Sequence, residues 1–560
     1  MPGITQIDRL HIDKGLGSYS AIKDQIEQTT FLVRVFDWKT GIGRNLPPVW
    51  CILGGTGAGK SAIFNSILSS DISDVGVKRP CTMTAIVMAH NMYAQALLQA
   101  PVTYEGDNRQ ANLLLDSKQE LNNAILIDTP DFDSIAQENK LIAQRFLVLS
   151  DVVVFVTSQE KYGDLACRQM LEEANDWGKK IILVLNKVTS NVAYDEYTEF
   201  TNTLKTVDKP VVIPRLDGVP TRIDGLTNNP QISNLLFAAP GSTINVNIKS
   251  HEINHLKSRA LTSVESLRSS IQKEIDRISQ VNSEIEEISR SISKELKSQL
   301  DAIVSQDVEK RMKSRLQALL RKYDILFVPR LMLRNALKSV AGYVSELLFS
   351  NTRPEDNYQD DREMRFEDFS GVESIAPLGP LDKAVTNLNL RVAELLSSNP
   401  GYEDLKSYSL KNVKRFDYDT IKSMYGDAFP GLENLLEAEF ENLRQGLTRF
   451  DEIKLYGSYT LWALLLITFE IVIGGGLTLL DLLLNSVIVP FIPKWLLDLK
   501  ILDILKSIAR RVDLEHKACL QGIVTKQSAM YTDSFASMAP DKEAIEGIEE
   551  LAHRISVART

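Results

Sequence analysis

Residues 49–68 read VWCILGGTGAGKSAIFNSIL. Their centre, Gly54 to Ser61, fits the phosphate-loop pattern of one glycine, four residues and then Gly-Lys-Ser/Thr. The apolar run Val49–Leu53 predicts a buried strand before the loop, and helical spacing follows over Ala62–Leu68. A chance glycine-rich turn is the alternative, and the strand and helix around the loop disfavour it.

The residue types in this loop are those that phosphate binding needs. Glycines let successive backbone N–H groups turn toward phosphate oxygens, and the following helix adds the positive end of its dipole. We therefore expect nucleotide contacts from Gly54, Gly55, Thr56, Gly57, Ala58, Gly59, Lys60, Ser61 and Ala62. Lys60 is predicted to reach the β- and γ-phosphates, and the Ser61 hydroxyl to ligate Mg²⁺.

Composition narrows the class of protein. A chain of 560 residues is too long for one core, and 44% apolar with 24% charged residues is ordinary for a folded protein. The net charge of −10 argues against nucleic acid as the main partner. Four scattered cysteines without a C-x-x-C motif indicate a reduced, cytosolic-facing protein, and the N-terminus has no apolar signal segment.

Apolar runs alternate with helical patterns in the head, residues 47–246, which predicts an α/β fold with a mostly parallel sheet. The expected strands are Val49–Leu53, Ala85–Ala89, Ala124–Asp128, Val152–Val156, Ile181–Leu185 and Val211–Pro214. Ligands of such sheets bind at the carboxyl ends of the strands. Three further segments are therefore expected to converge on the phosphate loop.

Asp128 ends one of these strands and is placed to support the Mg²⁺ shell. Residues 78–84 lie between the loop helix and the next strand, and a threonine there could close over the γ-phosphate and the metal. The sequence leaves open whether Thr82 or Thr84 does so. Asn186 and Lys187, which leave a strand, are expected to contact a purine ring and to brace the phosphate loop.

Together these elements resemble the GTPase domain of the translation-factor-like class, and more specifically that of the dynamin superfamily. Residues 54–61 are similar to the dynamin-type loop, 78–84 to the first switch, 128–131 to the DxxG element and 186–187 to the base-reading element. The resemblance implies GTP and GDP as ligands, Mg²⁺ as cofactor and GTP hydrolysis. It implies catalytic roles for Lys60, Thr56, Thr82 and Thr84 and metal ligation by Ser61, Thr84 and Asp128.

The sequence departs from the family pattern at several positions. Asp131 stands where the family has a glycine whose N–H binds the γ-phosphate; it stays among the expected nucleotide contacts but adds like charge. Thr189 replaces the aspartate that pairs with guanine, so guanine preference over adenine is left open. Thr56 and Gly57 also replace common family residues. We expect slow hydrolysis, or hydrolysis stimulated by assembly.

Residues 247–457 predict an elongated helical neck and trunk. Apolar positions step by four and three in a heptad seam with two polar breaks: Ile271, Ile275, Ile278, Asn282, Ile285, Ser289, Ile292 and Leu296. The same pattern suits an ordinary bundle helix or a stalk. Residues 351–382 predict an acidic solvated loop, and the helical pattern that follows breaks near Pro400 and Pro430.

Residues 458–497 form the most apolar segment, with only Glu470 and Asp481 charged between Leu461 and Lys494. A straight membrane span needs about 20 apolar residues. The segment suits a spanning hairpin, a re-entrant hairpin or a buried core hairpin, and its length favours insertion into a lipid membrane.

Amphipathic helices are expected before the head, in residues 1–46 as part of the neck, and after the apolar segment, in residues 498–560 as returning helices. This order resembles bacterial dynamin-like proteins. The resemblance implies a homodimer or higher homo-oligomer through heads and stalk, membrane remodelling, and a place on the cytoplasmic side of a membrane. Two alternatives remain: a nucleotide-gated membrane-anchored scaffold with little hydrolysis, and a soluble ATPase with a helical bundle.

Overall fold

The computed structural model describes residues 12–73, 84–104, 109–133, 137–189, 195, 209–216, 220–302, 378–447, 453–484 and 501–558. The chain divides into two compact units. The first comprises the described residues of Met1–Asp13, Ser18–Ile275 and Pro540–Thr560, and the second those of Lys14–Gly17 and Asp276–Ala539. Helix α9, Thr243–Ala302, contributes to both units. The domain boundaries expected from the sequence remain predictions.

A seven-stranded sheet of order β3-β2-β4-β1-β5-β6-β7 forms the centre of the first unit within its described residues. The strands are β1 Val49–Gly54, β2 Ala85–His90, β3 Ala111–Asp116, β4 Ile125–Asp128, β5 Val152–Ser158, β6 Lys180–Val188 and β7 Val211–Pro214. The neighbouring pairs are parallel except β2 and β4, which are antiparallel. The mostly parallel α/β sheet and its six expected strands are confirmed.

Strand β3, which lies at the edge of the sheet, was not predicted from the sequence. Its burial is mixed, and Leu114 and Leu115 are exposed. An edge strand lacks the continuous apolar run that marks a strand covered on both faces. β1 has that run, because every residue from Val49 to Gly54 is buried.

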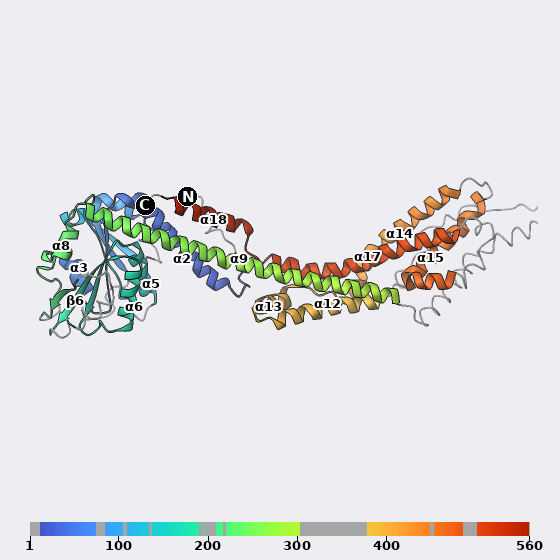
Figure 1. The fold of residues 1–560 in the computed structure, drawn as a ribbon, viewed down its shortest axis with the longest axis horizontal. Helices are drawn as coiled ribbons and strands as arrows, with labels where there is room; N and C mark the ends of the chain where they lie inside the picture. Colours follow the sequence, from blue (N-terminus) through green and yellow to red (C-terminus); the bar gives the residue numbers. More distant parts are fainter. Residues whose placement is uncertain are drawn as a thin grey trace, which may run out of the picture. The chain divides into compact units, whose positions relative to one another are not determined.

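Helices cover both faces of this sheet (Figure 1). The helices of the first unit are α2 Tyr19–Thr40, α3 Lys60–Leu68, α4 Ala94–Leu97, α5 Gln137–Leu149, α6 Leu165–Asp176, α8 Pro230–Leu236, the first part of α9 and α18 Lys542–Val557, with 3-10 turns at Ile42–Asn45, Asn91–Tyr93, Gln119–Asn122 and Leu226–Asn228. Phe64 of α3 packs in one core cluster with Trp50 and Ile52, the residues of β1 that alternate on that face.

A buried charge cluster joins α2 and α9 to the amino-terminal ends of the strands. Lys39 Nζ of α2 lies 2.7 Å from Asp151 Oδ1 and 2.8 Å from Glu252 Oε2 of α9. Lys179 Nζ, just before β6, lies 2.6 Å from Glu252 Oε1. Burial alone would raise the pKa of Asp151, but the nearby ammonium groups of Lys39 and Lys249 outweigh it and hold the pKa below its usual range.

The C-terminal helix α18 also packs in the first unit. Arg554 Nη2 pairs with Asp37 Oδ2 of α2 at 3.0 Å, and Arg268 Nη2 of α9 pairs with Glu549 Oε1 at 2.5 Å. The apolar face of α18 is buried through Ile548, Leu551 and Ile555. Residues from both ends of the sequence therefore pack beside the same sheet domain.

The second unit is helical in its described residues. It contains the later part of α9 with α12 Leu378–Ser398, α13 Glu403–Asn412, α14 Tyr418–Leu447, α15 Ile453–Leu483 and α17 Ile501–Ala536, and a 3-10 turn at Pro400–Tyr402. α12 and α17 flank α9 (Figure 1), with ion pairs between Arg391 and Glu295 and between Lys517 and Asp301. The apolar members of the heptad seam are buried. Asn282, at a polar break, donates to the Thr532 carbonyl at 3.2 Å.

Two expectations for this unit need correction. α12 begins at Leu378, so the last residues of the predicted 351–382 loop are helical; the remainder of that loop lies outside the described residues. Pro380 falls in the first helical turn, where a missing N–H costs nothing. α14 continues through Pro430 instead of breaking there; Leu432 and Leu436, which lie one turn apart on the same face of the helix, are buried beyond the proline and hold the helix in place.

Helix α15 covers the first part of the apolar segment 458–497, and residues 485–497 lie outside the described residues. Gly476 interrupts it with φ 71°, a backbone conformation that favours glycine. Most of its described apolar side chains, such as Phe469 and Leu480, are buried within the second unit. Among the helices of the described residues, none combines the length and apolarity that crossing a bilayer requires.

Replacement of Lys39 by alanine is expected to destabilise the first unit by about 3 kcal/mol, because it removes the ammonium group that pairs with the buried Asp151 and Glu252 carboxylates. Urea unfolding followed by tryptophan fluorescence measures the loss. Lys23→Ala, an exposed lysine on the same helix, is the matched control. Equal unfolding midpoints for the two variants would show that the cluster contributes no stability.

His516 of α17 is buried and shares a 3.1 Å hydrogen bond with the Tyr425 hydroxyl, and burial lowers its pKa from 6.5 to about 4. Between these values the unfolded chain binds a proton that the folded chain does not, so stability falls as pH falls, by about 1.4 kcal/mol per unit. We expect His516→Gln to lose less thermal stability than wild type between pH 7 and pH 5. His553→Gln, an exposed histidine, should follow wild type; identical behaviour of all three proteins contradicts the assignment.

Candidate functional site

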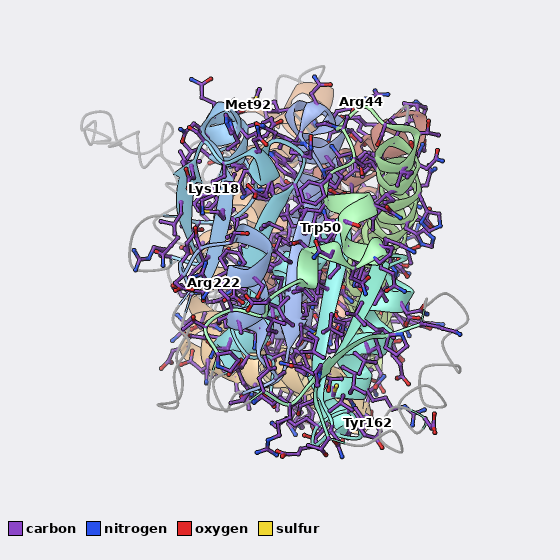
Figure 2. The ribbon with its side chains drawn as sticks, turned by 90° about the vertical axis from the view of Figure 1, so that its left-hand side faces the viewer. Arg44, Trp50, Met92, Lys118, Tyr162 and Arg222 are labelled. Atoms are coloured by element: carbon purple, nitrogen blue, oxygen red, sulfur yellow. The ribbon has the colours of Figure 1, made fainter. Side chains whose placement is uncertain are left out.

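The phosphate loop links the end of β1 to the start of α3. Gly57 has φ 75° and Gly59 has φ 100°, both in the left-handed region that glycine adopts without strain. A Cβ at Gly59 would collide with the Asn186 side chain, so this position also needs a glycine for space. Figure 2 shows Tyr162, which follows β5, at the opposite end of the head from Arg44 and Met92. The loop lies at the Tyr162 end, where β1, β4, β5 and β6 terminate.

Ser61 and Asp128 meet at the base of the loop. Ser61 Oγ donates to Asp128 Oδ2 at 2.9 Å, and Ser73 Oγ donates to the same oxygen at 2.7 Å. Asp128 is fully buried, and its Oδ1 has no hydrogen-bond partner among the described residues. Burial raises the pKa of Asp128, while the charge of Lys60 and these hydroxyl donors oppose the rise.

These oxygens fit a hard divalent cation. Mg²⁺ prefers oxygen ligands and commonly takes one or two from protein and the others from phosphate and water. The hydroxyl of Ser61 and the unpartnered Oδ1 of Asp128 supply such atoms. The described residues contain no cluster of three or more histidine, cysteine or acidic side chains suited to a metal held by protein alone.

Lys60 extends along the inside of the loop and is 6% exposed. Its ammonium donates to the Gly55 carbonyl at 3.3 Å and forms an ion pair with Asp131. The acidic residue at the glycine position of the DxxG element therefore lies on the side chain predicted to bind the β- and γ-phosphates. A nucleotide phosphate and this carboxylate would compete for one cation.

Asp133, which the sequence analysis did not select, contacts the loop a second time. Its Oδ1 accepts from both the backbone N–H and the hydroxyl of Thr56, each at 2.6 Å, and its Oδ2 accepts from Lys161 Nζ at 2.6 Å. Burial alone would raise the pKa of Asp133, but these hydrogen bonds from Lys161 and Thr56 lower it overall. The only signal in the sequence was a second aspartate two residues after Asp131.

Asn186 and Lys187 at the end of β6 brace the loop from the other side. Asn186 Nδ2 donates to the Ala58 carbonyl at 2.9 Å, and Lys187 Nζ donates to the Gly57 carbonyl at 2.8 Å. Lys187 has φ 62°, which is uncommon for a residue with a side chain. Both contacts have the bracing form that the sequence suggested.

Thr189, at the position of the family's guanine-binding aspartate, contacts another side chain. Its backbone N–H and its hydroxyl bond Gln159 Oε1 at 2.9 and 2.8 Å. Gln159 follows β5 directly. The pair offers neutral amide and hydroxyl groups beside Lys187, where the family has a carboxylate.

The two candidate switch threonines differ. Thr82 lies outside the described residues. Thr84 directly precedes β2. Because Ile86 pairs with Asp128 in antiparallel register, the start of β2 lies beside the end of β4, and Thr84 lies at the same end of the strands as the phosphate loop. Its hydroxyl accepts from Asn112 Nδ2 of β3 at 3.2 Å. The structure thus brings Lys60, Ser61, Asp128 and Asp131 together, whereas the described contact of Thr84 is to the neighbouring strand.

Residues 49–187 match the family model described as 50S ribosome-binding GTPase, which covers less than half of the chain. No curated protein matches the sequence. An Era variant from Aquifex aeolicus bound to GDP·AlF4⁻ is similar at 16% identity over 35% of this chain, with a TM-score of 0.25; the chain spans 58% of that protein's length.

Two structures of an oligomerised bacterial dynamin pair, which provides a mechanism for the long-range sensing and tethering of membranes, are similar over the whole chain. Their identities are 10% and 12%, they are covered to 96% and 95%, and both TM-scores are 0.38. At these TM-scores the likenesses to solved structures support no argument about function. The family match and the loop geometry identify residues 49–187 of this chain as a GTPase domain.

Proposed function

We propose that this protein binds and hydrolyses GTP with Mg²⁺ and, as a dynamin-like protein, couples nucleotide-dependent head dimerisation to membrane binding or remodelling. The observation that carries the nucleotide part is the phosphate loop, with Lys60 buried along its inside and Ser61 bonded to Asp128 beneath it. This constellation lies inside the matched GTPase domain.

The chain's contribution to hydrolysis is positioning and electrostatics. Lys60 neutralises charge that develops on the phosphates, and Ser61 with Asp128 would hold Mg²⁺, which supplies further positive charge to the phosphate oxygens. Backbone N–H groups of the loop orient the phosphates because Gly57 and Gly59 allow the required turns. Thr82 or Thr84 is proposed to close the site.

Guanine is the proposed base because the loop and its bracing residues belong to the matched GTPase domain. Asn186 and Lys187 hydrogen-bond the loop, and we propose that they also contact the purine ring. Thr189 and Gln159 lack the carboxylate that pairs with two guanine N–H groups, so we propose weaker discrimination against adenine than a charged pair would give.

The membrane part of the proposal comes from the order of segments. A GTPase head is followed by the long helix α9, a helical unit and the apolar segment 458–497. Most of the described apolar side chains of α15 are buried against helices of their own unit, so contact of these side chains with a membrane requires that packing to open. We propose that homo-oligomers assembled through heads and helical unit drive this opening on the cytoplasmic side of a membrane.

A scaffold that binds nucleotide but barely hydrolyses it is the second candidate. The Asp131–Lys60 ion pair favours it, because a carboxylate beside the γ-phosphate opposes both binding and the charge of the transition state. The two candidates differ in turnover and not in nucleotide binding.

We expect wild-type protein to bind a fluorescent GTP analogue with Mg²⁺ more tightly than the matching ATP analogue, and Lys60→Ala to lose at least about tenfold in affinity, since a charge-assisted contact to phosphate is removed. Lys23→Ala, which changes an exposed lysine outside the phosphate loop, is the control. Fluorescence titration measures both. Binding of neither nucleotide by wild type would overturn the nucleotide part of the proposal.

Turnover with and without vesicles of neutral and anionic phospholipids separates the two candidates. We expect phosphate release to be slow in solution and to rise at least about tenfold on vesicles, because assembly brings heads together. Binding without lipid-stimulated turnover would favour the scaffold. Turnover indifferent to lipid, with ATP preferred, would favour a soluble ATPase instead.

Replacement of Asp131 by asparagine is expected to raise GTP affinity by about tenfold, because Lys60 no longer has a carboxylate as internal partner. GDP should gain less, since the competition is greatest at the terminal phosphate. Asp24→Asn on α2 is an exposed control. Unchanged GTP binding in titrations of Asp131→Asn would mean that Asp131 does not compete with phosphate, and weaker binding would mean that it supports the nucleotide site.

A further inference from the structure

Lys161 is a further cation close to the phosphate loop, in addition to Lys60 and Lys187. It lies in a turn after β5, where the N–H groups of Lys161 and Tyr162 both bond the Ser158 carbonyl, at 2.9 and 3.1 Å. β5 is the direct parallel neighbour of β1 in the sheet, so the turn after β5 lies at the same end of the strands as the phosphate loop after β1. The side chain of Lys161 is 32% exposed, which is low for a lysine in a surface turn.

One carboxylate connects Lys161 with the loop. Asp133 bonds Thr56 through Oδ1 and Lys161 through Oδ2, so the Lys161 ammonium is separated from the Thr56 N–H only by the width of a carboxyl group. A Cβ at Gly55 would lie 2.8 Å from Asp133 Oδ2, so a glycine at this position admits the carboxylate. The other acidic neighbour of Lys161, Asp164, is 4.0 Å away and largely exposed.

The Thr56 N–H bonded by Asp133 is the kind of group with which a phosphate loop binds oxygen anions. A carboxylate oxygen and a phosphate oxygen both accept charge-assisted hydrogen bonds, and a single N–H serves one of them well at a time. A phosphate that takes this donor therefore displaces Asp133 Oδ1 and arrives beside the ammonium that Asp133 had paired.

We propose that Lys161 is a phosphate-binding cation of this site, held beside Thr56 by Asp133 until the terminal phosphate of the nucleotide takes the place of that carboxylate. The inference rests on the nucleotide binding proposed above. It gives the site a positive charge in addition to Lys60, which offsets the negative charge that Asp131 adds. The flexible stem of a lysine allows its ammonium to follow the exchanged anion.

Titrations with a non-hydrolysable GTP analogue and with GDP test the proposal. Lys161→Gln should lose about tenfold in affinity for the GTP analogue and less than about twofold for GDP, because the contact is to the terminal phosphate. Lys161→Arg should keep most of the affinity for the GTP analogue, since it keeps the charge. Lys140→Gln, an exposed lysine on α5, is the matched control.

A double-mutant cycle with Asp133→Asn separates direct phosphate contact from an effect through Asp133. Asp133→Asn alone should bind the GTP analogue more tightly, because it removes the competing charge. If Lys161 contacts phosphate, Lys161→Gln still costs about tenfold in the Asp133→Asn background. If Lys161 serves only to hold Asp133, the cost disappears in that background and the proposal is overturned.

Two further outcomes are informative. Equal loss of GTP-analogue and GDP affinity in Lys161→Gln, with no recovery in Lys161→Arg, would show a structural role and overturn the proposal. Wild-type protein that binds neither nucleotide would overturn the proposed function itself, a result distinguishable from a wild type that binds and a Lys161→Gln variant that binds equally well.

Discussion

The packing of the first unit depends on a group of charges that are removed from water together. Lys39, Asp151, Glu252 and Lys179 are all buried, and each ammonium lies within 2.8 Å of a carboxylate oxygen. A buried charge left without its partner destabilises the fold by more free energy than the pair contributes to stability, so all four side chains must occupy one common arrangement. Because they come from α2, the strand ends and α9, that geometry fixes where both helices meet the sheet.

The nucleotide site lies at the opposite ends of the same strands. β1 and β5 run from the charge cluster to the phosphate loop and to the turn that carries Lys161. The Val49 N–H bonds Asp151 Oδ2 at 2.8 Å, so the start of β1 is itself tied to the cluster. The phosphate loop and the contacts of α2 and α9 therefore lie at opposite ends of the same two paired strands.

Two acidic side chains, Asp131 and Asp133, contact the phosphate loop. Asp131 pairs with Lys60, while Asp133 takes the N–H and hydroxyl of Thr56. Both carboxylates engage groups that bind phosphate in sites of this class, and both follow β4 within a few residues. In the proposed function a nucleotide phosphate therefore exchanges with these carboxylates, and its affinity depends on the difference between phosphate and carboxylate contacts.

The sequence by itself determined the elements whose structure depends only on neighbouring residues. The Gly54–Ser61 loop follows from the backbone freedom of its glycines, strand β1 from an apolar run that is buried on both faces, and the heptad seam of α9 from the helical period. Each of these patterns can be recognised within a short stretch of sequence. Tertiary structure decided the rest. The edge strand β3, the passage of α14 through Pro430, and the pairing of Asp133 with Thr56 and Lys161 depend on partners far along the chain. A sequence pattern names the groups that can bond, whereas only packing brings distant groups within hydrogen-bonding distance.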